Sequence, residues 1–336
     1  MFEKVEHILI VKPSALGDIV HSLPFLAAVK KQYPSAKVDW VVAHGLHRFL
    51  EGHPLIHRLW VIKKDHWKKP GRLYDTVKEI YELQTGLKSQ RYDLCVDLSG
   101  LLRSGLISWA SRARIKLGFK GADEGSPLFY THKVRGSMQI HAIDRYLKIA
   151  GFMGCATDQI EYPFAPYDKH PALLNDLPEE FCIMSPSAGK PANRWQAEKY
   201  GRLASRLDLP VIVIAGGAEA DIAQEVVAAS NGNAISLAGK TSLKELIALI
   251  AKARFFVCND TGPMHIAAAL NIPVFAIFGP ANPIRTGPYG DIHTVIRCET
   301  DCAPCYAHKP CSDFRCMDGI SVNMVWEQIR EKTGGL

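Results

Sequence analysis

The chain has 336 residues, of which 47% are hydrophobic and 22% are charged, and its formal net charge is +6. This length predicts two domains, because it exceeds the size at which a single core keeps growing, and the apolar content excludes a disordered protein. No apolar run is long enough to span a membrane, and the opening residues lack the apolar stretch of a signal peptide. We therefore expect a cytoplasmic protein, and its positive charge favours an anionic partner.

The first half of the chain alternates short apolar runs with amphipathic segments. The runs at 7–12, 37–43, 58–63 and 93–98 predict strands, and segments between them have helical spacing. Continuously apolar strands that alternate with helices are typical of a parallel sheet covered on both faces. The sequence therefore predicts an α/β domain over residues 1–160.

The stretch KPSALGDIVHSLP, at residues 12–24, leaves the first predicted strand and enters a helix. It places Asp18 at the helix start, beyond the carboxyl end of the strand, where ligands bind in open α/β sheets. Asp18 as a plain helix cap, worth about 1 kcal/mol, is one interpretation. The other is a general base that takes a proton from an attacking hydroxyl.

A basic stretch, VIKKDHWKKPGR, occupies residues 61–72 and holds five cations against one acid. Such a stretch fits an anionic glycolipid or a membrane surface, although a solvated loop explains most of its lysines equally well. We take Lys64 as the candidate acceptor contact within it. Arg103, in LSGLLRSG, is a further candidate that a solvated helix would also explain.

Four prolines in residues 161–180 predict a linker. Alternation of strands and helices then resumes, which predicts a second α/β domain at 181–318. A last helix is expected within 319–336, and we expect it to pack back toward the first domain. Two such halves suggest two Rossmann-like, doubly wound parallel-sheet domains that face a cleft.

The sharpest motif of the second half is FFVCNDTGPMHIAAAL, at residues 255–270. A buried strand ends in Asn-Asp, and a proline opens the next helix, whose free N–H groups and dipole favour an anion. A capped helix with a buried core histidine is the plainer interpretation. The candidate ligand contacts of this turn are Asp260, Thr261, Gly262 and His265.

Two more loops follow strands of this half, MSPSAGKPANRW at 184–195 and AGGAEAD at 215–221. The first offers Ser187 and Lys190. The second offers Glu219, an acid of the kind that accepts hydrogen bonds from ribose hydroxyls, although complementing a helix dipole is its simpler role. The chain has neither a G-x-G-x-x-G motif after its first strand nor a Walker motif, so an ordinary dinucleotide site is not supported.

In this order, the motifs of the chain resemble the lipopolysaccharide heptosyltransferases, the ADP-heptose-dependent enzymes of glycosyltransferase family 9. The resemblance rests on VKPSALGDIVHSLP, YDLCVDLSGLLRSG, HAIDRYLKIAGFMG, PANRW, LAGKTSLKELIALIAKARFFVCNDTGPMHIAAAL and FGPANP. It implies a GT-B fold and an inverting transfer of heptose from ADP-heptose to an anionic glycolipid, the lipopolysaccharide core, without metal or other cofactor. It also implies peripheral contact with the inner face of the bacterial inner membrane and no nucleic-acid partner.

The resemblance also assigns roles by position. It makes Asp18 the catalytic base, and it places acceptor contacts at His141, Arg145 and the basic stretch that holds Lys64, while Arg103 is a candidate from the sequence alone. It assigns the donor to Ser187, Thr241, Asp260, Thr261, Gly262 and His265, and the candidate donor residues also include Lys190, Asn193, Arg194 and Glu219. Relatives usually carry a lysine where this chain has Asn193, so we expect Lys190 or Arg194 to supply that charge.

Other functions fit the same fold. A nucleotide-sugar epimerase would change the donor alone, a regulatory module would bind a nucleotide sugar without turnover, and another member of the family would use a different donor or acceptor. The cysteine-rich segment 298–316 adds a separate question. Only Cys302 and Cys305 have ordinary metal spacing, which makes structural zinc the minority interpretation, and a reducing cytoplasm disfavours disulfides.

Overall fold

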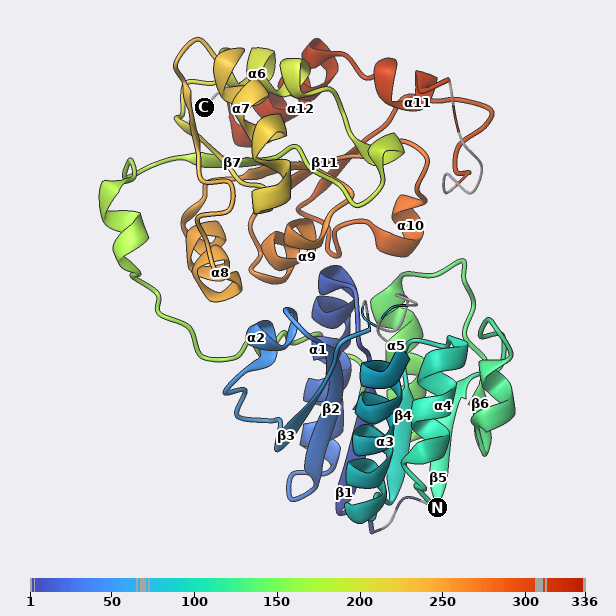
Figure 1. Ribbon diagram of the computed structural model, residues 1–336. Coiled ribbons are helices and arrows are strands. Elements are labelled where there is room, and N and C mark those ends of the chain that lie inside the picture. Colours follow the sequence, from blue (N-terminus) through green and yellow to red (C-terminus); the bar gives the residue numbers. More distant parts are fainter. Residues whose placement is uncertain are drawn as a thin grey trace. The chain divides into compact units, whose positions relative to one another are not determined.

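The computed structural model describes residues 2, 4–64, 66, 71, 73–305, 311 and 313–334. The chain divides into two compact units, Met1–Pro166 and Tyr167–Leu336 (Figure 1). The boundary falls inside the predicted proline-rich linker. The first part of that linker packs on the first unit, where the carbonyl oxygen of Pro163 lies 2.7 Å from His53 Nε2. Among the described residues, no helix has both the length and the apolar character needed to cross a membrane.

The first unit is built on a parallel sheet of six strands. They are β1 (His7–Val11), β2 (Lys37–Ala43), β3 (Arg58–Ile62), β4 (Leu94–Asp97), β5 (Ile115–Phe119) and β6 (His132–Val134), in the order β3-β2-β1-β4-β5-β6. The helices are α1 (Leu16–Gln32), α2 (His47–Leu50), α3 (Leu73–Ser89), α4 (Leu102–Ala110) and α5 (Ala142–Phe152), with a 3-10 turn at Ser126–Phe129.

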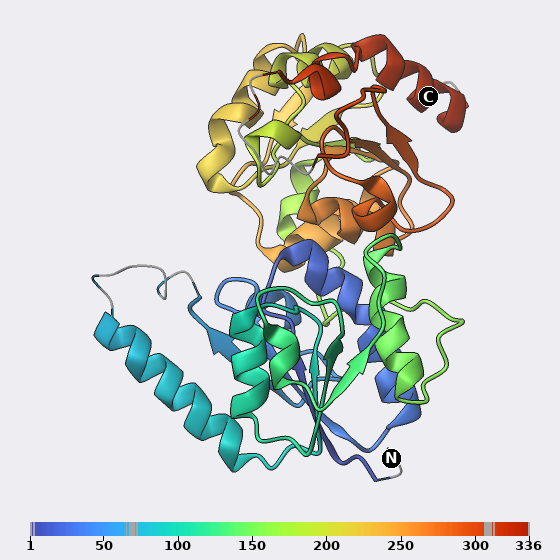
Figure 2. The same ribbon diagram turned by 90° about the vertical axis from the view of Figure 1, so that its right-hand side faces the viewer.

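Both faces of this sheet are covered, which is why its strands are continuously apolar. Leu9 of β1 joins Leu87 of α3 and Ile107 of α4 in one buried cluster. Helices α1 and α5 pack together on the opposite face (Figure 2). In the register of the sheet, the last residue of β1, Val11, pairs with Val41 on one side and Asp97 on the other. The loop after β1 therefore leaves the sheet where the strand order reverses, the usual ligand position in such sheets.

The second unit repeats the same strand order. Its strands are β7 (Cys182–Ser185), β8 (Val211–Val213), β9 (Ala234–Ser236), β10 (Phe256–Asn259), β11 (Val274–Ile277) and β12 (Thr294–Ile296), ordered β12-β11-β10-β7-β8-β9 and paired in parallel. Its helices are α6 (Ala197–Ala204), α7 (Ala220–Ala228), α8 (Leu243–Lys252), α9 (Gly262–Ala269), α10 (Pro283–Thr286), α11 (Arg315–Asp318) and α12 (Val322–Thr333). Short 3-10 turns occur at Ala172–Asp176, Pro191–Asn193 and Gly217–Glu219.

The last helix, α12, belongs to the second unit. Its buried side chains, Val325 and Ile329, join the hydrophobic core of that unit around Trp195. The indole Nε1 of Trp195 also donates a hydrogen bond of 2.9 Å to the carbonyl of Ile320, just before α12. We expected this helix to pack toward the first domain, whereas its apolar face is buried in the second.

Candidate active site

Asp18 lies in the first turn of α1, at the carboxyl end of β1. Its Oδ2 accepts a hydrogen bond of 2.8 Å from the backbone N–H of Ala15, and this bond caps the helix. Its Oδ1 lies 3.3 Å from Nζ of Lys12 and accepts a hydrogen bond of 3.3 Å from the hydroxyl of Tyr146. The side chain is still 39% exposed. One carboxylate thus caps a helix and also presents a positioned oxygen at an accessible place.

Lys12 is the main member of this site that the sequence motifs did not indicate. It is buried, with 5% of its surface exposed, and its Nζ lies 5.2 Å from the centre of the Tyr146 ring. Burial by itself lowers the pKa of Lys12, but the neighbouring Asp18 carboxylate and Tyr146 outweigh it and raise the pKa above its ordinary value. Lys12 is therefore a fixed cation beside Asp18. In the sequence, the signal for Lys12 was its position at the end of the otherwise apolar run HILIVK.

Three of the predicted acceptor residues lie near Asp18. Nζ of Lys64 donates a hydrogen bond of 2.8 Å to Oγ of Ser14, in the loop between β1 and α1. His141 caps α5, and its ring lies 5.0 Å from that of His21 on α1. Arg145 directly precedes Tyr146, the tyrosine that contacts Asp18.

The fourth predicted acceptor residue, Arg103, is in the first turn of α4, which follows β4. It lines a groove between α3 and α4 together with apolar side chains. Four other residues of the predicted basic stretch, Trp67, Lys68, Lys69 and Arg72, lie outside the described residues.

In the second unit, a buried asparagine joins the loops that follow β7 and β10. Asn259 donates a hydrogen bond of 2.7 Å from Nδ2 to the carbonyl of Pro186, and its Oδ1 accepts one of 3.0 Å from the N–H of Trp195. Nδ2 of Asn193 donates a longer bond of 3.4 Å to Oδ2 of Asp260. These contacts bring two loops that are far apart in the sequence to one edge of the sheet.

A pocket of about 270 Å³ opens at this edge. It is lined by Gly189, Lys190, Asn193, Asp260, Ala281, Arg285 and Thr286. Three predicted donor residues, Lys190, Asn193 and Asp260, therefore share one pocket. Arg285 and Thr286 were not predicted. They come from α10, which follows β11, and the motif FGPANP that precedes them was the signal available.

The helix that follows Asp260 begins as the motif predicts. Thr261 is the N-cap of α9, its backbone is extended, and Gly262 and the following proline open the helix. Of its first turn, Pro263 has no N–H and the N–H of Met264 bonds to the carbonyl of Thr261, so the N–H of Gly262 and the helix dipole are what this helix start, next to the pocket that contains Asp260, can offer an anion. His265, one turn in, is buried, with 7% of its surface exposed.

The remaining predicted donor residues lie on the loops after β7, β8 and β9. Ser187 is buried after β7. Arg194 forms an ion pair of 2.7 Å with Glu219, and its Nε donates a bond of 3.0 Å to the carbonyl of Ala188. Thr241 follows the loop in which the N–H of Gly239 bonds to the carbonyl of Ala215. Because Arg194 is engaged by Glu219 and Lys190 lines the pocket, the geometry favours Lys190 as the substitute for the usual lysine at position 193.

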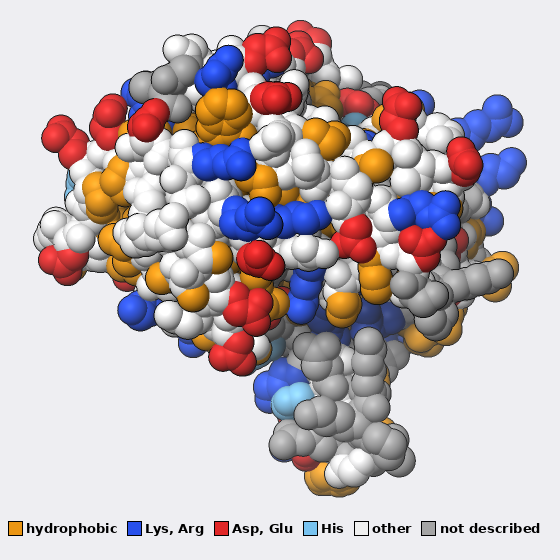
Figure 3. Space-filling model, turned by 90° about the horizontal axis from the view of Figure 1, so that it is seen from above, with side chains coloured by type: hydrophobic (Ala, Val, Ile, Leu, Met, Phe, Trp, Pro, Cys, Tyr) orange, Lys and Arg blue, Asp and Glu red, His pale blue; other side chains and the backbone are white. Residues whose placement is uncertain are grey.

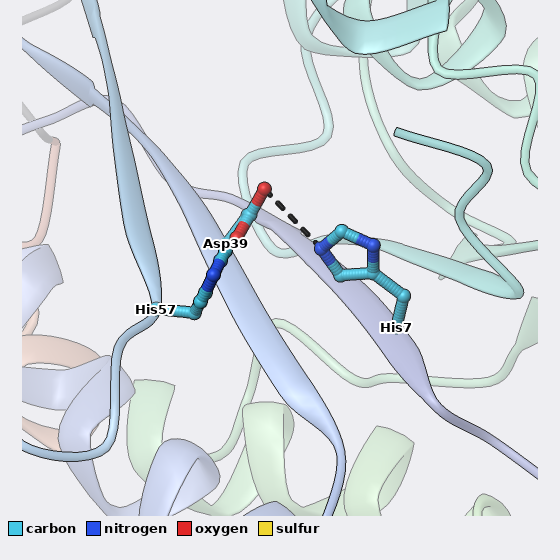
Figure 4. A group of neighbouring side chains, drawn as sticks. All are labelled: His7, Asp39 and His57. Atoms are coloured by element: carbon cyan, nitrogen blue, oxygen red, sulfur yellow. Dashed lines mark hydrogen bonds and ion pairs between the residues drawn. The ribbon is translucent and has the colours of Figure 1, made fainter. Parts of the chain in front are cut away.

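A second group of titratable side chains lies at the amino ends of β1 and β2 (Figure 4). The carboxylate of Asp39 lies 3.0 Å from Nδ1 of His57 and 3.3 Å from Nε2 of His7, and it accepts a bond of 2.6 Å from the hydroxyl of Tyr92. Burial would raise the pKa of Asp39, but these hydrogen bonds outweigh it and hold the pKa at about 2. The side chains of His7, Asp39 and His57 could hold a metal ion, yet both carboxylate oxygens of Asp39 already have partners. The group stabilises the amino ends of the strands, whereas Asp18 lies at the carboxyl end of β1.

The cysteine-rich segment is only partly described, because residues 306–310 and 312 lie outside the described residues. None of the nine cysteines forms a disulfide. Within the described part of the chain, His7, Asp39 and His57 form the one group with metal-ligating geometry, and no cysteine belongs to it. The zinc interpretation of Cys302 and Cys305 therefore gains no support from their described neighbours.

The sequence model of glycosyltransferase family 9 (heptosyltransferase) matches residues 80–313. The chain is 27% identical to the lipopolysaccharide core heptosyltransferase OpsX of Haemophilus influenzae, over 93% of this chain and 90% of that protein. It is 30% identical to lipopolysaccharide heptosyltransferase 1 of Pseudomonas aeruginosa, over 89% of this chain and 85% of that one. Among solved structures, it is similar to Escherichia coli heptosyltransferase WaaC with ADP, with a TM-score of 0.79, 24% identity, and coverage of 97% of this chain and 99% of that one. This likeness and the two parallel sheets confirm the α/β, GT-B fold class.

Proposed function

Because the chain belongs to glycosyltransferase family 9, we propose that it transfers heptose from ADP-heptose to the inner core of lipopolysaccharide. The names of its relatives support this substrate pair. The observation that carries the proposal is the pair of sites at equivalent sheet edges. One holds a positioned carboxylate, Asp18, and the other holds a cationic pocket beside a helix start.

In the proposed reaction, Asp18 takes the proton of the acceptor hydroxyl as that oxygen attacks the anomeric carbon of the heptose. The new glycosidic C–O bond forms while the bond between the anomeric carbon and the diphosphate oxygen breaks, and ADP leaves with the electron pair. Attack opposite the leaving group inverts the anomeric configuration. Lys12 and Tyr146 hold Oδ1 of Asp18 in place, and the exposed part of the carboxylate receives the proton.

The donor diphosphate is proposed to bind in the second unit. Lys190 and Arg285 supply two cations at the pocket, and the N–H of Gly262 at the start of α9 supplies a fixed dipole. We propose that these groups stabilise the departing ADP without a divalent ion. Asp260, which shares the pocket, would then accept hydrogen bonds from sugar hydroxyls.

The acceptor is proposed to bind in the first unit, where Lys64 bonds to the loop before Asp18 and His141 lies against α1, the helix that carries it. Lys64 and Arg145 are cations of the kind that suits a phosphorylated, carboxylated glycolipid. Because such an acceptor sits in a membrane, we also propose that the protein works in the cytoplasm, in peripheral contact with the inner membrane.

The proposal is tested by incubating the protein with ADP-heptose and a heptose-free core lipid, with EDTA in excess, and following product mass. We expect one heptose to be added to the lipid and ADP to be released. An incubation with donor alone tests the alternative, because an epimerised nucleotide sugar would identify an epimerase. Transfer that is lost in EDTA and restored by Mg²⁺ would contradict the metal-independent mechanism.

A further inference from the structure

A groove with a volume of about 540 Å³ runs between α3 and α4 of the first unit. Its walls are mostly apolar: Ile80 and Leu83 come from α3, and Leu102, Leu106, Ile107, Trp109 and Ala110 come from α4, with Gln84 and Arg103 as polar members. The two helices lie side by side on the outside of the unit (Figure 2). The site proposed above uses none of the apolar residues of this groove.

The apolar surface continues outside the groove. Tyr74, Val77 and Tyr81 are 82%, 58% and 67% exposed, and their spacing puts them on one face of α3. On α4, Leu106 is 46% exposed and Trp109 is 56% exposed. Exposed apolar side chains on both helices that form an apolar groove mark an interaction site on a folded protein.

Among the described residues that line the groove, the charged side chain is a cation, Arg103. Two of the three acids of α3 pair with lysines, Glu79 with Lys63 at 3.3 Å and Glu82 with Lys78 at 3.9 Å. Residues 98–122, which include all of α4, contain five cations and no acid, although Glu124 accepts a hydrogen bond of 3.0 Å from the N–H of Leu102. On the face shown in Figure 3, side chains of both signs are scattered.

We infer that the face made by α3 and α4 is the surface by which this protein docks on an anionic lipid bilayer. A bilayer offers an apolar interior under negatively charged headgroups, which matches an apolar groove with an arginine in its wall. Tyr74, Tyr81 and Trp109 are residues of the type that concentrates at membrane interfaces, with an apolar ring and a polar atom. Arg103, in the groove wall, is then placed to meet a headgroup phosphate.

A second copy of the chain fits this surface less well. A two-fold dimer through this face would bring Arg103 of both copies into one mostly apolar interface, and no acid is among the described residues that line the groove. Docking on a membrane rests on the proposed function in one respect: the acyl chains of a glycolipid acceptor remain in the bilayer, so the enzyme must work at its surface. Helix α4 begins beyond the carboxyl end of β4, the strand that pairs with β1, so its first turn lies at the same sheet edge as Asp18.

The experiment measures co-sedimentation with vesicles of phosphatidylethanolamine and phosphatidylglycerol, and with neutral phosphatidylcholine vesicles. The test variant is Leu106→Ser with Trp109→Ser. The matched control is Ile235→Ser with Val295→Ser, two exposed apolar residues of the second unit, at 45% and 38% exposure. We expect the test variant to bind anionic vesicles about tenfold more weakly and the control to bind like the parent. A second variant, Arg112→Glu with Arg114→Glu, is expected to lose the preference for anionic over neutral vesicles.

Heptose transfer is then compared on the core lipid in vesicles and on a deacylated, water-soluble core acceptor. Docking through α3 and α4 predicts that the Leu106→Ser, Trp109→Ser variant loses transfer in vesicles and keeps it on the soluble acceptor. A parent protein that transfers heptose to neither acceptor contradicts the proposed function, while its vesicle binding still tests the docking surface. Equal vesicle binding by parent and test variant overturns the inference. So does a test variant that changes only self-association in sedimentation velocity, which would identify a second copy as the occupant.

Discussion

The two units of this protein share one strand order but place different chemistry where that order reverses, after β1 in the first unit and after β10, the counterpart of β4, in the second. After β1, the chain puts Asp18 in the first turn of a helix, where Lys12 and Tyr146 contact its Oδ1. After β10, it puts Asp260 just before a helix, where the carboxylate lines a pocket with Lys190 and Arg285. Both are acids at a strand-to-helix turn.

What differs is the surroundings of each carboxylate. Asp18 has a buried cation and a tyrosine hydroxyl on one oxygen, an arrangement that fits the proposed proton transfer. Asp260 shares its pocket with two cations that suit a diphosphate, which fits the proposed role in binding. The comparison teaches that strand order fixes where a ligand binds, while the neighbours that tertiary packing supplies decide what a residue there does.

The largest expected effects come from substituting the two carboxylates, one proposed for catalysis and one proposed for donor binding. Asp18→Asn is expected to lower kcat by about 10²-fold or more, because the amide cannot accept the acceptor's proton, with ADP binding nearly unchanged. Asp260→Ala is expected to spare ADP and to weaken binding of ADP-heptose, since its proposed partner is the sugar. Steady-state kinetics and calorimetry with both nucleotides measure the two effects. Near-normal turnover of Asp18→Asn would remove Asp18 from the chemistry.

The cations of the second unit provide the next test. Lys190→Ala and Arg285→Ala are each expected to weaken ADP binding about tenfold or more, because each removes a charge-assisted contact to the diphosphate. Lys199→Ala is the control, since Lys199 bonds to the carbonyls of Asp318 and Ile320 and does not line the pocket. If calorimetry gives the parent's affinity for both variants, the diphosphate does not bind in this pocket.

Much of the fold could be predicted because its signals are local. The run HILIV is buried along β1, and the continuously apolar strands correctly indicated parallel sheets covered on both faces. The position of Asp18 in a first helical turn follows from the sequence in the same way. The helix at the end of the chain shows what local signals cannot predict. Its apolar residues Val325 and Ile329 are buried in the core of the second unit, and that choice of core depends on tertiary packing.

The site was predictable only in part, for a related reason. Asp18 and Tyr146 are 128 positions apart, and their contact depends on α1 packing against α5. Local patterns also could not show that Arg194 pairs with Glu219, or that Arg285 reaches the pocket from α10. Motifs identify which residues follow a strand, whereas the partners of those residues come from segments distant in sequence.

Lys12 offers a test of positioning within the first unit. Lys12→Met removes the cation beside Asp18 and keeps most of the side-chain volume. We expect kcat to fall about tenfold, less than for Asp18→Asn, because the base remains but is less well oriented. The acid limb of the pH–rate profile is expected to move to higher pH, since the charge beside the Asp18 carboxylate is gone.

The control for this test is Lys12→Arg, which keeps the charge and should retain the parent's acid limb. A purely structural role for Lys12 would lower the amount of folded enzyme without moving the pH profile. An unchanged profile in Lys12→Met would therefore contradict positioning by charge.

The smallest expected effect on catalysis concerns Asp39, at the opposite ends of the same strands. Its folded pKa of about 2 lies below the ordinary value of 3.8, so the carboxylate adds stability at pH values above its unfolded pKa. That contribution, of the order of 2 kcal/mol, is lost as the pH falls from about 4 toward 2.

Asp39→Asn is expected to lower the free energy of unfolding at pH 7 by a similar amount, to flatten this acid-dependent loss, and to leave kcat of the folded enzyme unchanged. Urea unfolding across this pH range measures the effect, with the exposed Asp158→Asn as the control. A parent-like acid dependence in Asp39→Asn would mean that another carboxylate controls acid stability, and a drop in kcat would tie these strand ends to the site at their other edge.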